Sequence, residues 1–452
     1  MINKLQAIKK QINKDNKTLL LNVAGNYLVK GGAMLVSLMI MPAYMRYFES
    51  QAVLGMWFTI TQLLNWIMLL DFGIGGGLRN KIVEPLKSGN RKYVTELVSS
   101  AYFSVGAIVA FFIILQAFCL DAVEWNTILG VSTDDIDEKI LLKMVHILTV
   151  GICFRFFTVL VSQILYALQK ATMPGFINLI SSALIMLYLV FAKPTGTPND
   201  IIRLAYVNSI SNNAPAVIAT IWVFATKLKG MYPRLSAVKI KAVKEVLGTG
   251  GTLFYLQIVL MLLFNVKEIY INWFIGAEEV VEYQVYYKLI GMIGGLFSLA
   301  LNPIWSAVTK AIAEKKYRWV KHLYRRCLYL VGLFCVAQLL FIALMPWIVK
   351  IWLGKQAIEV SRIYGLIFCF YNVIYMLTML NYNFACGMNQ TKTITFWLTF
   401  ASISNLLLTV WGSQLVQSWV ITIIASAIAA IPCTIFVRRD LYSVISSLND
   451  DI

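Results

Sequence analysis

Long apolar runs, separated by short polar segments, follow one another along almost the whole chain. A helix needs about 20 mostly apolar residues to cross the hydrocarbon core of a bilayer, and each run reaches that length. Because the core offers no water to backbone N–H and C=O groups, a run that crosses it must satisfy them itself as an α-helix. The pattern therefore predicts twelve spanning helices, at residues 18–42, 51–71, 94–120, 141–168, 174–193, 201–226, 248–275, 284–307, 326–349, 361–385, 393–412 and 417–437.

The composition agrees with an all-α integral membrane protein. Hydrophobic residues make up 59% of the 452 residues, charged residues make up 13%, and the mean hydropathy is +0.72. A water-soluble globular chain carries about 25% charged residues, so this chain falls outside that class. The loops between twelve spans are short, which leaves no room for a large soluble domain.

The charged residues predict how the chain is oriented in the membrane. There are 39 Lys and Arg against 22 Asp and Glu, a net charge of +17. The basic residues gather in alternate loops, at 79–92, 227–244 and 310–326, and acidic residues gather in the opposite loops, at 121–138 and 278–282. Cytoplasmic loops retain Lys and Arg during insertion, so we expect the basic loops and both termini to be cytoplasmic. The alternation also argues against nucleic acid as a partner.

The longest basic connection divides the chain near its middle. We expect an N-terminal six-helix lobe at 1–226, a basic cytoplasmic linker at 227–247, a C-terminal six-helix lobe at 248–437 and a cytoplasmic tail at 438–452. Two halves of equal helix number are typical of transporters built from structural repeats, which place the substrate path where the repeats meet.

Several kinds of catalytic and metal site are not indicated. The seven cysteines occur singly and the two histidines lie far apart, so we expect no metal, no cofactor, no disulfide framework and no histidine-based catalytic cluster. The glycine-rich segment 71–81 lacks the lysine pattern of a phosphate-binding loop, which argues against an ATPase. Its glycines favour close helix packing or a hinge instead.

A few ionisable residues lie inside the apolar runs and are the candidates for function. They are Lys30, Arg155 and the neighbours Lys267 and Glu268, with Asp71 at the inner end of the second run. Each charge at membrane depth costs at least about 2.5–3.5 kcal/mol on insertion scales, which a polar cavity, a partner or a ligand must offset.

Polar residues at helical spacing accompany these charges. Asn22 and Asn26 precede Lys30 at four-residue intervals, while Asn265 and Asn272 flank Glu268. Each set is predicted to form one polar stripe on its helix. We expect these stripes, together with Arg155, Thr158 and Ser162, to face a wet cavity. The alternative is that the charges form structural pairs between helices, or that Lys267 snorkels to the membrane surface.

The chain resembles the Wzx-type O-antigen and capsular polysaccharide flippases, which belong with the MATE exporters and the lipid II flippase MurJ to the MOP superfamily. The resemblance rests on Pro42-Ala43-Tyr44, Arg46-Tyr47-Phe48, Leu54-Gly55-Met56-Trp57, Asp71-Phe72-Gly73, Gly77-Leu78-Arg79-Asn80 and Asn302-Pro303-Ile304-Trp305. Gly76 departs from the family pattern, which often has Asn before the last glycine of the loop.

The resemblance implies two six-helix lobes around a cationic cavity and the translocation, by alternating access, of oligosaccharides linked to undecaprenyl pyrophosphate. It places the chain in the bacterial inner membrane, with membrane lipids, a polysaccharide polymerase and a chain-length regulator as partners. Combined with the residues above, it suggests three roles. The cations Lys30, Arg155 and Arg79 would bind pyrophosphate, the amides Asn22, Asn26, Asn265 and Asn272 would bind sugar hydroxyls, and Glu268 or Asp71 would exchange the coupling ion.

Two other functions remain open from the sequence. A MATE-like exporter of cationic drugs would need carboxylates in its cavity without an excess of cations, which is not the pattern here. A membrane enzyme such as a polysaccharide polymerase would carry a large outer loop with catalytic Arg or His. The longest outer loop, at 121–140, contains neither residue type, so we expect no enzymatic activity.

Overall fold

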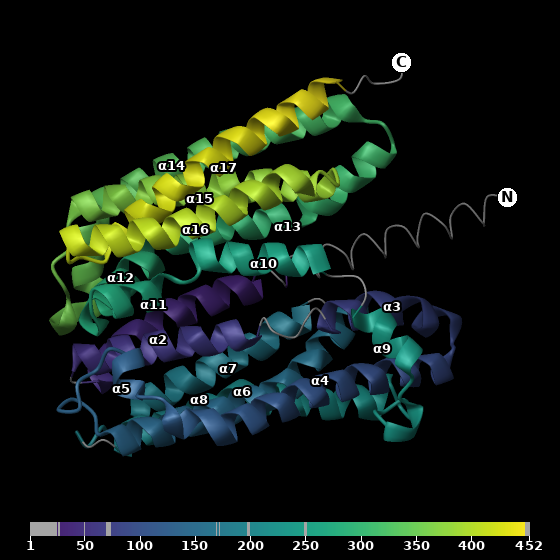
Figure 1. Ribbon diagram of the computed structural model, residues 1–452, viewed down its shortest axis with the longest axis horizontal. Helices are drawn as coiled ribbons and strands as arrows, with labels where there is room; N and C mark the ends of the chain where they lie inside the picture. Colours follow the sequence, from purple (N-terminus) through teal and green to yellow (C-terminus); the bar gives the residue numbers. More distant parts are fainter. Residues whose placement is uncertain are drawn as a thin grey trace. The chain divides into compact units, whose positions relative to one another are not determined.

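The computed structural model describes residues 25, 28–48, 50–68, 74–168, 170, 172–196, 199–247 and 251–447, and within these ranges every regular element is helical (Figure 1). The N-terminal half contains the helix Leu28–Tyr47, followed by α2 (Gln51–Ile67), α3 (Ile74–Ser88), α4 (Arg91–Cys119), α5 (Trp125–Ile128), α6 (Glu138–Ala167), α7 (Thr172–Phe191), α8 (Asn199–Trp222) and α9 (Ile240–Leu247). The C-terminal half contains α10 (Gly251–Phe264), α11 (Lys267–Phe274), α12 (Ala277–Tyr286), α13 (Met292–Ala313), α14 (Tyr317–Leu353), α15 (Arg362–Gly387), α16 (Thr391–Leu415) and α17 (Val420–Ser447).

Within the described residues, each of the twelve predicted runs lies on helices. Among the described residues, eight helices are long and apolar enough to cross a membrane, and the bent pair formed by α10 and α11 brings the number to nine. The remaining three predicted runs correspond to α2, to α8 and to α13 with the turn before it. The chain is therefore a multi-pass, all-α membrane protein, as its apolar pattern predicts.

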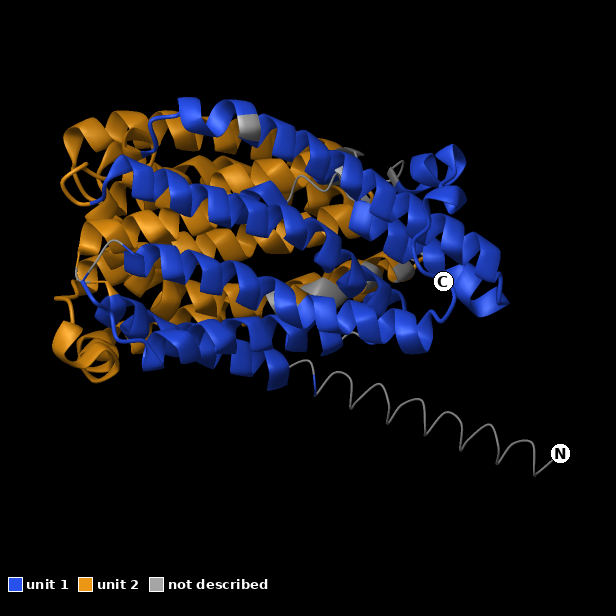
Figure 2. Cartoon of the chain, turned by 90° about the horizontal axis from the view of Figure 1, so that it is seen from below, with its two compact units in different colours: residues 1–47, 64–125, 136–254 blue, residues 48–63, 126–135, 255–452 orange. Residues whose placement is uncertain are grey.

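The chain divides into two compact units, coloured separately in Figure 2. Unit 1 comprises residues 1–47, 64–125 and 136–254, and unit 2 comprises residues 48–63, 126–135 and 255–452. Unit 2 thus includes most of α2 and the loop that contains α5, together with the C-terminal helices.

Unit 1 packs α6 against α8 and against α3 and α4. Its core contains fully buried Ile82, Leu97, Phe156 and Val223, and α9 lies against α3 and α4 beside it. The Arg46 guanidinium donates hydrogen bonds of 2.7 Å to the carbonyl oxygens of two residues at the end of α7. A cation that caps a helix C-terminus satisfies carbonyls that have no partner within the helix. Arg46, in the motif Arg46-Tyr47-Phe48 at the end of the helix Leu28–Tyr47, therefore has a structural role.

Unit 2 packs α17 against α15 and α16, and α13 against α15. Next to the start of α17, unit 2 holds an aromatic cluster in which fully buried Trp419 lies 4.8 Å from Tyr286 and 5.9 Å from Tyr283, centroid to centroid. One of its buried amides, Asn372, donates hydrogen bonds to the backbone O of Ile290 at 2.9 Å and to Gln338 at 2.8 Å. Buried polar groups that are paired in this way specify one helix arrangement rather than a solvent path.

Three features of the chain differ from the sequence predictions. The glycine-rich segment after α2 and the basic linker contain the short helices α3 and α9, and α14 starts at Tyr317 rather than near 326. The continuous spanning helix predicted at 248–275 is wrong, because α10 and α11 are separated by a break and bend by 46°. The sequence did not predict α3 and α9 because their apolar runs are too short for a membrane span. It did not predict the break between α10 and α11 because two residues hardly change the apolar composition of the run.

Candidate functional site

The break between α10 and α11 forms a polar centre inside unit 2. Asn265 and Val266 separate the two helices, so the last carbonyls of α10 have no partner in a following turn. The end of α10 carries the negative end of its helix dipole and the start of α11 carries the positive end of its own. The first two residues of α11 are Lys267 and Glu268, which place one charge of each sign at this junction.

Lys267 reaches back to the end of α10. Its side chain is fully buried, and Nζ donates a hydrogen bond of 2.7 Å to the backbone O of Leu263 and a second one to Oγ of Ser426. The ring centroid of Tyr371 lies 5.6 Å from Nζ. The ammonium group is thus held by a carbonyl, a hydroxyl and an aromatic face, which together compensate part of the cost of its burial.

Helices α16 and α17 contribute further hydrogen bonds around the Lys267 ammonium and the end of α10. Oγ of Ser426 lies 2.6 Å from Oδ1 of Asn405, and Nδ2 of Asn405 donates a hydrogen bond of 3.3 Å to the backbone O of Leu262. Both side chains are fully buried. A second carbonyl at the end of α10 therefore accepts a hydrogen bond from a neighbouring helix. Side chains of α11, α16 and α17 together hold the end of α10 in place.

Glu268 lies at the N-terminus of α11, where the helix dipole favours an anion. Its side chain is 5% exposed, and Oε1 accepts a hydrogen bond of 2.8 Å from Nε2 of Gln284. Lys267 and Lys288 both act on it electrostatically. Lys288 belongs to the π-helical turn Tyr287–Gly291, a type of irregularity that often occurs at functional sites.

In this cluster of Lys267, Glu268, Lys288, Gln284 and Ser426, the carboxylate of Glu268 is the group that could exchange a proton. Sequence reasoning found Lys267 and Glu268 but missed the other three. Lys288 lies at the start of the run predicted at 284–307, so its charge was a signal that could have been used. Serine and glutamine in a span carry no such signal, because they are tolerated on any helix face.

The two amides predicted beside Glu268 have different positions. Asn265 lies in the break, and its backbone O accepts a hydrogen bond of 2.9 Å from Nε2 of Gln62. Asn272 lies in α11 and is buried, with no hydrogen-bond partner for its amide within the described residues. The stripe Asn265, Glu268 and Asn272 is therefore not continuous. A buried amide without a protein partner is a place for a water or a ligand.

Arg155 occupies a polar position within unit 1. Nη1 donates a hydrogen bond of 2.6 Å to the backbone O of Asn212 on α8, and Nη2 donates one of 3.4 Å to Oδ1 of Asn178 on α7. In the described part of the chain it forms no ion pair. Thr158, one turn further along α6, donates a hydrogen bond of 3.0 Å to Oδ1 of Asn213 and is buried. The guanidinium is held by dipoles, and no carboxylate of the described ranges forms an ion pair with it.

Two other predicted site residues are described in unit 1. Lys30 is half-buried near the start of the helix Leu28–Tyr47, and Arg79 is exposed on α3 with its guanidinium 4.8 Å from the ring centroid of Tyr166. Asn22, Asn26 and Asp71 lie outside the described residues. Within the described ranges, no group of three His, Cys, Asp or Glu side chains is placed to hold a metal ion.

The fold is similar to that of solved transporters of the MOP superfamily. A MATE family multidrug resistance transporter in an inward-facing conformation superimposes with a TM-score of 0.69, covering 93% of this chain and 96% of the other at 13% identity. The lipid II flippase MurJ in an inward closed conformation gives a TM-score of 0.69 at 16% identity, covering 94% and 87%. A MOP superfamily transporter from Pyrococcus furiosus gives a TM-score of 0.61 at 14% identity, covering 94% and 96%.

One curated relative is similar in sequence. It is a protein of Yersinia pseudotuberculosis described as a putative O-antigen export protein, 24% identical over 266 residues. The match covers 57% of this chain and spans 58% of the relative's length. No family model matches the chain. The likeness to Wzx-type, MATE and MurJ proteins predicted from sequence motifs is therefore found again by independent comparisons.

Proposed function

We propose that the protein is a flippase that moves oligosaccharides linked to undecaprenyl pyrophosphate across the bacterial inner membrane, for O-antigen or capsular polysaccharide synthesis. The observation that carries the proposal is Arg155, a cation at membrane depth that forms no ion pair within the described residues. Even a half-buried charge within a membrane span is costly to keep unless it serves a function, and an anionic substrate group is a natural counterpart. Guanidinium groups bind phosphate oxygens through two parallel hydrogen bonds.

Similarity supports the lipid-linked substrate. The curated relative is described as exporting O-antigen, and MurJ is described as flipping lipid II, which is also a lipid-linked saccharide. In this proposal both relatives and the present chain are transporters and not enzymes. A lipid-linked saccharide presents an anionic group beside sugar hydroxyls, so the site must supply both cations and neutral donors.

The proposed mechanism is alternating access through a cationic cavity, coupled to an ion gradient. Lys30, Arg155 and Arg79 attract the pyrophosphate, and Asn22, Asn26, Asn265 and Asn272 bind sugar hydroxyls. Glu268, or Asp71, binds and releases the coupling ion. Because Glu268 shares the break between α10 and α11 with Lys267, a change in its charge alters the electrostatic balance that holds the two helices at their present angle.

The proposal includes the topology predicted from charge. Residues 1–226 and 248–437 form two six-helix lobes, the linker 227–247 and the tail 438–452 are cytoplasmic, and the N-terminus lies on the same side. A polysaccharide polymerase and a chain-length regulator would act on the product after it has crossed the membrane.

Complementation of a strain that lacks its own flippase tests the proposal. Lys30→Ala and Arg155→Ala are expected to reduce surface polysaccharide and to cause lipid-linked precursor to accumulate on the cytoplasmic side. Arg362→Ala, which changes an exposed arginine at the start of α15, is the matched control, and membrane insertion is confirmed for each variant. Full polysaccharide display by both test variants would exclude Lys30 and Arg155 from the substrate path.

A MATE-like exporter is the second candidate, because a MATE structure and the MurJ structure superimpose equally well on this chain. The same strain separates the two. If loss of the protein leaves surface polysaccharide unchanged but increases sensitivity to cationic dyes, the exporter is correct and the flippase is wrong.

A further inference from the structure

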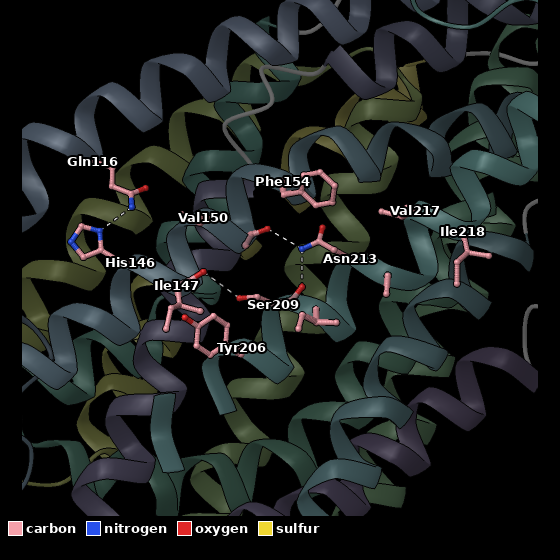
Figure 3. Close-up of a pocket in the computed structure, with 13 residues that line it drawn as sticks. Gln116, His146, Ile147, Val150, Phe154, Tyr206, Ser209, Asn213, Val217 and Ile218 are labelled. Atoms are coloured by element: carbon pink, nitrogen blue, oxygen red, sulfur yellow. Dashed lines mark hydrogen bonds between the residues drawn. The ribbon is translucent and has the colours of Figure 1, made fainter. Parts of the chain in front are cut away.

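Unit 1 contains a groove between α4, α6 and α8 that the proposed transport function does not use (Figure 3). Its volume is about 830 Å³. The walls are apolar side chains that remain exposed in the whole chain, including Val150 (57%), Ile210 (62%) and Ile218 (67%). The groove lies on helices that span the membrane, so the medium at its mouth is aliphatic.

The polar atoms on the floor of the groove are already bonded to one another. Asn213 donates hydrogen bonds of 3.0 Å to the backbone O of Gly151 and of 2.9 Å to that of Ser209, and Ser209 donates one of 3.3 Å to the backbone O of Ile147 (Figure 3). A Cβ on Gly151 would overlap the side chain of Ser209, so the glycine lets α8 lie directly against α6. The floor therefore offers an apolar surface to whatever occupies the groove.

The length of the groove along α8 is close to the thickness of one membrane leaflet. Its lining on α8 runs from Tyr206 to Ile218, which is about 18 Å at 1.5 Å per residue. Half of a hydrocarbon core of about 30 Å is roughly 15 Å. A single acyl chain of the leaflet on the side where α6 and α8 begin fits this length, whereas a much longer polyprenyl chain does not.

Charges of both signs lie at the end of the groove nearest the starts of α6 and α8. Lys143 is exposed one turn before His146, on the same face of α6, and Arg203 lies one turn before Tyr206 on α8. Asp200 pairs with Arg203 at 3.3 Å. His146 bridges Gln116, at 3.0 Å from Nδ1, and Asp121, at 2.9 Å from Nε2. The Asp121 side chain is 71% exposed, so its second oxygen is free to accept a donor from outside.

We propose that this groove is a specific site for a zwitterionic phospholipid with a primary ammonium group, that is, phosphatidylethanolamine. Its phosphate lies against Lys143 and Arg203, its ammonium donates to Asp121, and one acyl chain fills the groove between Val150 and Ile218. The combination of cations with one outward-facing carboxylate matches a headgroup that carries both signs. A purely anionic headgroup would place a negative charge near the carboxylate of Asp121 and be repelled by it. A trimethylammonium headgroup has no N–H to donate to that carboxylate.

Lipid titration of the purified, delipidated protein in detergent tests the site, with bound lipid counted by native mass spectrometry. The unmodified protein is expected to bind one dioleoyl phosphatidylethanolamine about fivefold more tightly than dioleoyl phosphatidylcholine, the effect of one exposed charge pair. Asp121→Asn keeps an acceptor for His146 but removes the charge, so the preference disappears. Lys143→Gln weakens both lipids alike.

A double substitution of the walls tests the acyl-chain site. Val150→Trp with Ile210→Trp fills the groove and is expected to abolish the bound lipid, whereas Leu187→Trp, at an exposed position of α7 outside the groove, leaves it in place. Equal binding of the two lipids, tighter binding of phosphatidylglycerol, or displacement by polyprenyl pyrophosphate would each overturn the proposal. If the tryptophan variants fail to fold, the two exposed headgroup variants still decide it.

Discussion

The ammonium group of Lys267 lies 2.7 Å from the carbonyl oxygen of Leu263, across the break that separates α11 from α10. A lysine at the first position of one helix thus closes the end of the preceding helix. The same break places Glu268 at the N-terminus of α11, so that each charge lies at the helix end that favours it. The break therefore has its own set of side-chain hydrogen bonds, made by Lys267 and Glu268.

Lys267→Ala is expected to destabilise the protein. The substitution leaves the carbonyl of Leu263 and the hydroxyl of Ser426 without this donor in a fully buried site, and the loss is expected to be about 2–4 kcal/mol. Thermal unfolding of the purified protein in detergent measures the effect. Lys350→Ala, at an exposed position in the last turn of α14, is the control. Equal unfolding midpoints for the two variants would show that Lys267 does not hold the break together.

Glu268→Gln tests whether the negative charge of Glu268 is needed for transport, because glutamine has nearly the same size and shape. Glutamine keeps an oxygen that accepts from Gln284 but removes the charge that compensates the buried ammonium of Lys267, so the unfolding midpoint is expected to fall modestly while the fold is kept. If Glu268 exchanges the coupling ion, transport falls about tenfold, which corresponds to an interaction of roughly 1.4 kcal/mol. Surface polysaccharide in the complementation strain is the measurement, and Glu278→Gln, at an exposed position of α12, is the control. Normal polysaccharide with Glu268→Gln would rule out ion exchange at this carboxylate.

The apolar pattern predicted the helices well and their irregularities poorly. Each run had the length that a bilayer demands, and within the described residues each run lies on helices, although the run at 248–275 is divided between α10 and α11. The break at Asn265 and Val266 left no trace in hydropathy, because one of its two residues is apolar. In the motif Leu54-Gly55-Met56-Trp57, the role of Gly55 also needed the tertiary structure: a Cβ there would overlap the backbone O of Ala277, far away in sequence.

The sequence indicated candidate site residues most clearly where an ionisable side chain lies inside an apolar run, because burying its charge is costly. Arg155, Lys267 and Glu268 stood out because a charge at membrane depth requires compensation. Their partners did not, since the oxygens that surround Lys267 are a backbone carbonyl and the hydroxyl of Ser426, and neither is unusual in a span. The identity of a compensating group depends on which helices are neighbours, and spacing along the sequence does not contain that information.

Arg155→Lys and Arg155→Met distinguish the two ways in which Arg155 could act. Lysine retains the charge but loses the planar fork that reaches both Asn212 and Asn178, whereas methionine retains only the apolar stem. If the charge attracts the substrate, Arg155→Lys keeps a measurable part of the polysaccharide display and Arg155→Met keeps none. If both variants lose display and both unfold at a lower temperature than the unmodified protein, Arg155 is a structural link between α6, α7 and α8.

Two adjacent glycines of α3 are expected to respond in opposite ways to alanine. A Cβ on Gly77 would overlap the backbone O of Val246 at the end of α9, whereas a Cβ on Gly76 meets nothing within 4 Å. Gly76→Ala is therefore expected to stabilise α3 by up to about 1 kcal/mol through helix propensity. Gly77→Ala forces α9 away from α3, because backbone cannot move aside as a flexible side chain does, and about 1–3 kcal/mol is lost.

The unfolding midpoints of the two alanine variants, purified side by side, provide the measurement. Both substitutions add the same methyl group to the same helix one residue apart, so differences in helix propensity, expression and detergent binding largely cancel. The comparison therefore isolates the contact between Gly77 and Val246. A Gly77→Ala protein as stable as Gly76→Ala would mean that α9 does not rest on α3, and that the glycine-rich motif serves a purpose other than close packing.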